Sequence, residues 1–113
     1  MVRRSFTAVL EHSVTFTADF ATEPYEAGWA TEARWFVHVL EMRGVLHVTP
    51  QISPDGLAWC DEGHLGARIE DAGLYSFPLR DFGHWLRVTG WLSGENHSAK
   101  VVIYLALKGV AET

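Results

Sequence analysis

Six histidines and one cysteine are the residues of this 113-residue chain best suited to metal or acid–base chemistry. Imidazole and thiolate groups are preferred zinc ligands, but a zinc site takes them in pairs at short, regular spacing. No His-x-His, His-x-x-x-His or paired-cysteine pattern is present among them. The histidines are His12, His38, His47, His64, His84 and His97. Their spacing predicts no metal site.

Two local groupings need separate interpretation. His38 and His47 could lie near each other across a hairpin that turns at Arg43-Gly44, and we interpret them as strand histidines satisfied by backbone or solvent. The segment Cys60-Asp61-Glu62-Gly63-His64 holds four possible ligands, but such tight spacing rarely lets all donors converge. We interpret it as an acidic, solvated loop beside a small buried cysteine.

Nucleophilic catalysis has no sequence support either. Serine, histidine and aspartate are present, but no Gly-x-Ser-x-Gly elbow accompanies them, and no glycine-rich loop that would hold a phosphate appears. We therefore predict a protein that is not an enzyme, with no catalytic residue, no metal and no cofactor.

Five tryptophans, at positions 29, 35, 59, 85 and 91, are more than one small core readily accommodates. Trp85, Arg87 and Trp91 share one face of a predicted strand, and Leu86, Val88 and Leu92 take the other. If the leucine face is the core, the tryptophans need cover from a loop, another subunit or a sugar ring. Alternation leaves open whether the tryptophan face is itself the core.

The segment Ser53-Pro54-Asp55-Gly56-Leu57-Ala58-Trp59, here called the turn cassette, predicts a hairpin. Proline presets φ, Asp55 can bond nearby backbone, and Gly56 tolerates a positive φ. Trp59 can then return over the sheet as a core anchor.

The rest of the chain predicts strands separated by turns roughly every 8–12 residues, as in sandwiches. Residues 3–10 and 13–20 are expected to pair through a turn at Glu11-His12, and 21–31 form a loop carrying Tyr25 and Trp29. Pro78 favours an edge strand. Further strands are expected at 34–42, 45–52, 65–69, 74–79, 85–92 and 100–108, with turns at 43–44 and 93–97. The prediction is one domain over residues 1–113, an all-β, antiparallel, jelly-roll-like β-sandwich of about eight strands.

Two predicted strands, 34–42 and 100–108, are apolar on both faces, which is unusual for a sheet with one face in water. Subunit contact explains the excess, so we predict a homo-oligomer, with a trimer as the expected form. The interface or ligand candidates are Trp29, Trp35, Val37, Val39, Trp85, Arg87, Trp91, Val102 and Tyr104.

Charge and targeting signals restrict the partners. The formal charge is −5, which disfavours nucleic acid. We find neither a signal peptide nor a membrane-spanning segment, and we expect cytoplasmic synthesis and no membrane partner. A single cysteine excludes an intrachain disulfide.

Several short motifs resemble the small, discoidin-like β-sandwich modules of bacteriophage head and tail proteins. They are Gln51 to Gly56 with Trp59, then Tyr75-Ser76-Phe77, Trp85-Leu86-Arg87-Val88, and Val101 to Gly109. The chain lacks the disulfide and much of the length of extracellular discoidin domains. The resemblance implies a non-catalytic structural or assembly module, with a virion or virion-like particle and its other subunits as the setting. Carbohydrate binding through surface tryptophans is the alternative.

Overall fold

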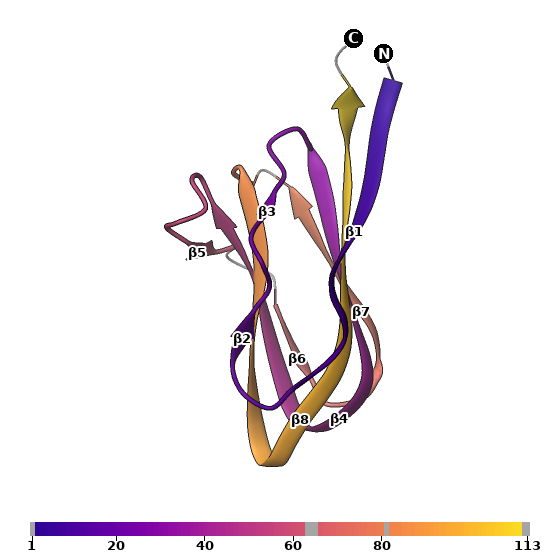
Figure 1. The fold of residues 1–113 in the computed structure, drawn as a ribbon, viewed down its shortest axis with the longest axis vertical. Coiled ribbons are helices and arrows are strands. Elements are labelled where there is room, and N and C mark those ends of the chain that lie inside the picture. The colour runs from indigo at the N-terminus through magenta and orange to yellow at the C-terminus, as the bar shows by residue number, and fades with distance from the viewer. Residues whose placement is uncertain (1, 63–65, 81, 112–113) are drawn as a thin grey trace.

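The structure is a computed structural model that describes residues 2–62, 66–80 and 82–111 (Figure 1). Its regular elements are the strands β1 (Val2–Phe16), β2 (Phe20–Ala21), β3 (Tyr25–Glu26), β4 (Glu32–Ser53), β5 (Cys60–Asp61), β6 (Ala67–Ile69), β7 (Gly73–Arg80) and β8 (Trp85–Ala111). These residues include no helix able to cross a membrane.

All eight strands belong to one antiparallel sheet, which confirms the all-β prediction. Its path is β1-β8-β4-β5; β2 and β3 also pair with β8, and β6 and β7 with β4. The two long strands β4 and β8 therefore organise the molecule. Because hydrogen bonds join every strand into the same sheet, a sandwich of two separate sheets and a jelly-roll topology are not shown.

Two expected turns are bends inside long strands. β4 continues through Arg43-Gly44 and β8 through residues 93–97, and they stay paired on both sides of the bend. Gly44 (φ 82°) and Gly94 (φ 102°) lie against each other there, at the lower end of Figure 1. The hairpin expected between 34–42 and 45–52 is wrong, because both segments pair with β8 instead. His38 lies opposite Val102 and His47 opposite Trp91.

The N-terminal hairpin is also wrong. β1 runs without a turn from Val2 to Phe16 and pairs with β8 throughout, with register shifts around Glu11. A positive φ at Ser13 (53°) accommodates the irregularity. The strand expected to reach Phe20 ends at Phe16, and the Phe16 and Phe20 rings stack with centroids 3.9 Å apart. The chain between them therefore turns rather than continuing as a strand.

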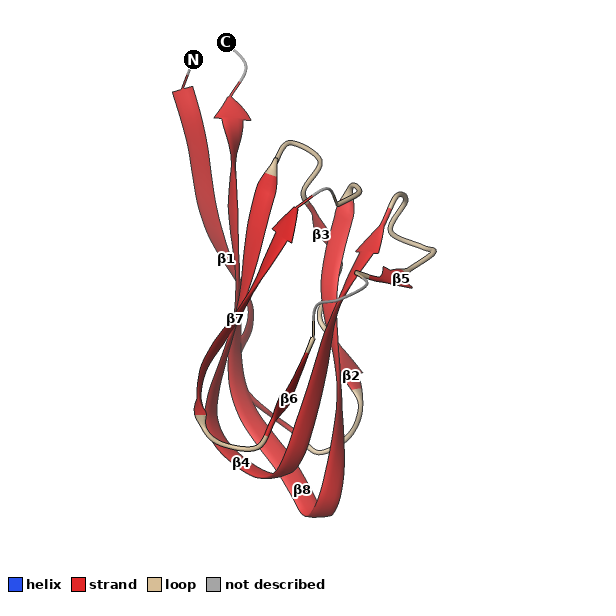
Figure 2. Cartoon of the chain, turned by 180° about the vertical axis from the view of Figure 1, so that it is seen from behind, coloured by secondary structure: helices blue, strands red, loops and turns tan. Residues whose placement is uncertain are grey.

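The bend divides the sheet into two arms that Figures 1 and 2 show from opposite sides. We call them the β1 arm (β1, β7, residues 32–43 of β4 and 98–111 of β8) and the β2 arm (β2, β3, β5, β6, residues 45–53 of β4 and 85–93 of β8). Side chains from both arms form one core. Burial of apolar surface between the arms thus keeps the sheet folded over.

The core settles which face of each strand is inside. Leu86, Val88 and Leu92 are buried, so the leucine face of β8 is the core face. Trp35, Val37 and Val39, expected at an interface, are at most 1% exposed and belong to the core. Alternation identifies which residues share a face of a strand. Which of the two faces is buried depends on the side that the other arm packs against.

Candidate binding surfaces

The turn cassette forms the predicted hairpin between β4 and β5, where Ile52 lies opposite Cys60. Gly56 has the expected positive φ of 80°. The Asp55 carboxylate accepts hydrogen bonds from the backbone N–H groups of Ala58 (2.9 Å) and Leu57 (2.8 Å). These bonds stabilise the charged form and lower the pKa of Asp55.

Trp59 is not the core anchor that the sequence predicts. It is only half-buried, lies outside the core cluster and packs under Arg87, whose Cζ atom lies 4.3 Å from the ring centroid. The ring beneath the cassette is Trp85: a Cβ on Gly56 would lie 3.2 Å from its Cδ2 and Cε2 atoms. Trp59 faces outward because it precedes Asp61 by two residues and therefore lies on the same, outer side of the sheet.

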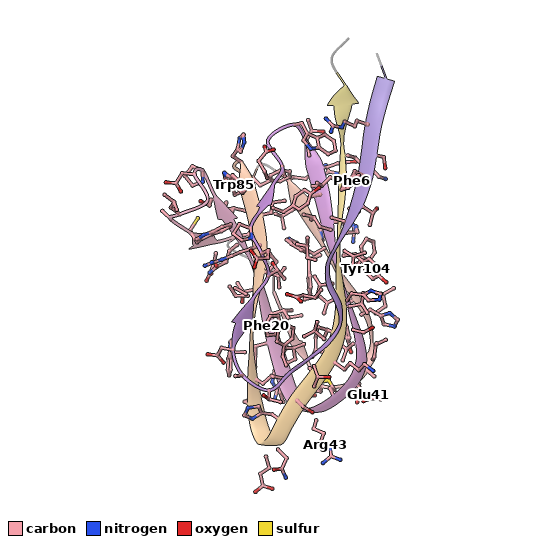
Figure 3. All side chains as sticks on the ribbon, in the orientation of Figure 1. Phe6, Phe20, Glu41, Arg43, Trp85 and Tyr104 are labelled. Atoms are coloured by element: carbon pink, nitrogen blue, oxygen red, sulfur yellow. The ribbon has the colours of Figure 1, made fainter. Side chains whose placement is uncertain are left out.

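The outer face of the β2 arm gathers aromatic and polar side chains on three successive rows of β8 and β4. These rows pair Arg87 with Gln51, Thr89 with Thr49, and Trp91 with His47. We call this surface, with Trp59 and Asp61 of the neighbouring hairpin, the tryptophan face. Figure 3 labels Trp85 at the start of the same strand.

One end of the tryptophan face is a connected polar network. Arg87 Nε donates to Gln51 Oε1 at 2.8 Å, and Gln51 Nε2 donates to Asp61 Oδ1 at 2.9 Å. With the guanidinium also stacked on Trp59, each group is held in a defined orientation. Sequence analysis did not predict this network, because Trp59 and Arg87 come together only when β5 and β8 both pair with β4.

The other end is the Trp91–His47 pair. The two rings are nearly parallel, 5° apart in tilt, with centroids separated by 3.7 Å. Trp91 nevertheless remains 48% exposed. An aromatic side chain held flat by a neighbour and open to solvent is a preformed surface for another ring.

The outer face of the β1 arm carries a group of apolar side chains beside the polar residues His38, Ser76 and Thr7, and we call this group the apolar face. Phe36 lies opposite Tyr104, which in turn lies opposite Val9 on β1; Figure 3 labels Tyr104. Val9 is 51% exposed, and Leu74 on β7 is 62% exposed. The remaining apolar members are Leu40, Val102 and Ala106. Val102 and Tyr104 therefore lie on the outer face, as the sequence predicts. Trp35 does not, because it is in the core, and its neighbour Phe36 occupies the outer face instead.

A cavity of about 300 Å³ opens at one end of the apolar face. Three cationic side chains from three neighbouring strands line it: Arg34, Arg80 and Lys108. Glu32 lies opposite both Arg80 and Lys108, and Phe36 contributes to the apolar part of the wall. The end of the apolar face is therefore basic although the chain is acidic.

The remaining candidates lie elsewhere. Trp29 is half-buried, with the Arg4 guanidinium 4.1 Å from its ring centroid. Cys60 is exposed rather than buried, and its thiol is 3.8 Å from the Ile52 carbonyl oxygen. His64 lies outside the described residues. Among those that are described, no three His, Cys, Asp or Glu side chains gather as a metal site would require.

Comparison with known proteins identifies a fold and no family. No protein-family model and no curated protein matches the chain. The structure is similar to the crystal structure of the PBSX exported protein XepA, with a TM-score of 0.59 and 11% sequence identity. The match covers 99% of this chain and 38% of that one, so the chain spans well under half the length of XepA. At this identity the likeness concerns the fold, a β-rich architecture shared with a protein of the phage-like element PBSX.

Proposed function

We propose that this chain is a non-catalytic structural module that assembles with further copies of itself, as a component of a virion or virion-like particle. The observation that carries the proposal is the apolar face of the β1 arm. The similarity to XepA supports the phage-like setting, since XepA comes from a phage-like element.

The apolar face is more apolar than a solvated sheet surface should be. An antiparallel sheet with one face on a core normally turns polar side chains to water. Here Val9 and Leu74 are each more than half exposed, beside the half-buried rings of Phe36 and Tyr104. Contact with another subunit would remove these side chains from water, at a gain of roughly 25 cal/mol for each Å² of apolar surface covered.

The charge distribution favours a second copy as the occupant. Arg34, Arg80 and Lys108 concentrate three of the nine cationic residues at one end of the apolar face. The whole chain carries a charge of −5, so the residues other than these three together carry a charge of −8. Acidic side chains of a second copy would complement this basic end, and complementary potentials guide association. The proposed assembly is a trimer, as expected from the sequence.

Sedimentation at micromolar concentration tests the proposal. We expect the wild-type chain to sediment as a homo-oligomer, and a Val9→Lys/Leu74→Lys double variant to sediment as a monomer with its far-ultraviolet circular dichroism unchanged. Both sites are exposed, so charge there is compatible with folding. The matched control is Leu57→Lys, since Leu57 is 85% exposed on the turn cassette, away from the apolar face. A monomeric wild type, or a folded double variant that still associates, would refute the proposal.

A further inference from the structure

We infer that the tryptophan face of the β2 arm is a binding site for a neutral oligosaccharide. The site consists of the Trp91–His47 stack at one end and the Trp59–Arg87–Gln51–Asp61 cluster at the other. It lies on the other arm from the apolar face, so it is an additional function and does not depend on assembly.

Trp91 has the properties of a sugar-stacking platform. The apolar C–H face of a pyranose packs on an indole ring, which must be open to solvent and fixed in orientation. His47 covers one side of the indole at 3.7 Å and holds it flat, while Trp91 as a whole remains 48% exposed. The His47 ring is itself held, because its Nε2 atom lies 3.4 Å from Ser93 Oγ. Little side-chain freedom remains to be lost when a ligand binds.

The polar cluster supplies what stacking lacks, namely oriented partners for hydroxyl groups. Arg87 uses Nε on Gln51, and its two terminal nitrogens carry four further N–H donors. Asp61 accepts from Gln51 through Oδ1, and a carboxylate can accept further bonds through its second oxygen. A donor and an acceptor on adjacent strands fit the alternating hydroxyl groups of a sugar better than they fit an apolar partner.

The spacing of the two ends sets the size of the ligand. Arg87 and Trp91 are four residues apart on the same side of β8, or about 13 Å. The row between them carries Thr89 and Thr49, with Ala21 of β2 on the other side of Thr89, and the Thr89 hydroxyl donates to the Thr49 carbonyl oxygen at 3.2 Å. Two bulky ends flank a row of small side chains, which suits a chain of several sugar rings lying along β8.

Charge decides between neutral and acidic sugars. The chain carries a net charge of −5, and Asp61 belongs to the site itself. An anionic polysaccharide would be repelled by both. Arg87 is already engaged by Trp59 and Gln51, and Arg68, which lies opposite His47 on β6, is paired with Glu70 at 2.6 Å. The favoured ligand is therefore neutral.

The test is a glycan array that displays neutral and anionic oligosaccharides, probed with the full chain. Titration of tryptophan fluorescence with the neutral glycans that bind, and with chitohexaose and cellohexaose as fixed probes, then gives affinities. We expect saturable binding of at least one neutral oligosaccharide, weakened about tenfold or more in Trp91→Ala and in Arg87→Ala. Trp91→Phe should retain most of the affinity, because it keeps an aromatic face.

Arg43→Ala is the matched control for Arg87→Ala, since Arg43 is an exposed arginine at the bend that belongs to neither named face, and its loss should leave glycan affinity unchanged. Melting temperatures show whether each variant is folded. The inference is overturned if no neutral glycan binds, if heparin or another polyanion binds better, or if affinity is the same in a folded Trp91→Ala variant. None of these results bears on sedimentation, so the assembly proposal stands or falls separately.

Discussion

Replacing Gly44 by alanine should destabilise the fold more than any other glycine-to-alanine change at the surface. Gly44 has φ 82°, and an added Cβ would lie 2.3 Å from the backbone carbonyl oxygen of Ser93. Left-handed backbone costs an alanine about 1–2 kcal/mol. The overlap is with main chain, which can yield only if β8 moves, at about 1–3 kcal/mol more. We expect a total loss of roughly 2–5 kcal/mol.

The measurement is equilibrium unfolding in urea, followed by far-ultraviolet circular dichroism at one fixed protein concentration, because association would itself change the apparent stability. The matched control is Gly28→Ala. A Cβ there would also lie 2.3 Å from a neighbour, but that neighbour is the exposed imidazole of His84, which can rotate away at the loss of only its exposed contact with Glu26 (2.6 Å). Gly28 also lacks a positive φ. We expect a loss below about 1 kcal/mol for the control.

Comparing Gly44→Ala with Gly28→Ala tests why residue 44 is a glycine. Both variants add the same methyl group at the same nominal distance from another atom. If Gly44→Ala and Gly28→Ala lose the same small amount of free energy, the bend does not depend on Gly44, and the explanation of how β4 and β8 fold over is wrong.

Two further predictions concern a pair of tryptophans and one carboxylate. Trp35→Ala should lower the free energy of unfolding in urea by about 3–5 kcal/mol, because Trp35 is fully buried. Trp59→Ala should lower it by roughly 1–2 kcal/mol, because the half-buried Trp59 ring loses mainly its contact with Arg87. Equal losses would contradict the assignment of Trp35 to the core and Trp59 to the surface. Asp55→Ala should lower the melting temperature at neutral pH, since the hydrogen bonds from Ala58 and Leu57 hold the pKa of Asp55 below its usual 3.8. That stabilisation is present above pH 3.8 and is lost as the pH falls through the lowered pKa, so the melting temperatures of wild type and variant should converge in acid; a gap that stays constant with pH would contradict it.

Local chemistry determined much of this protein. Alternation of apolar and polar residues correctly predicts an all-β chain and the shared face of Leu86, Val88 and Leu92. The turn cassette forms its hairpin with Gly56 at positive φ, because proline, aspartate and glycine act on their own backbone within a few residues. The edge position of Pro78 follows in the same way from its missing N–H, and within the described part of the chain β7 pairs with β4 alone.

Only the tertiary structure decided whether the chain turns back at Arg43-Gly44 or continues as one long strand. A glycine at positive φ serves equally well in a hairpin turn and in a bend within a strand, so Arg43-Gly44 could not reveal that β4 continues. The outcome depends on β8, whose bend at Gly94 meets Gly44 from fifty residues away in the chain.

The same long-range pairing decided which tryptophans face water. It placed Trp35 in the core, turned Trp59 outward under Arg87 and set Trp91 against His47. Strand parity groups residues by face, but burial depends on which faces the folded sheet brings together, and that is a property of the whole chain.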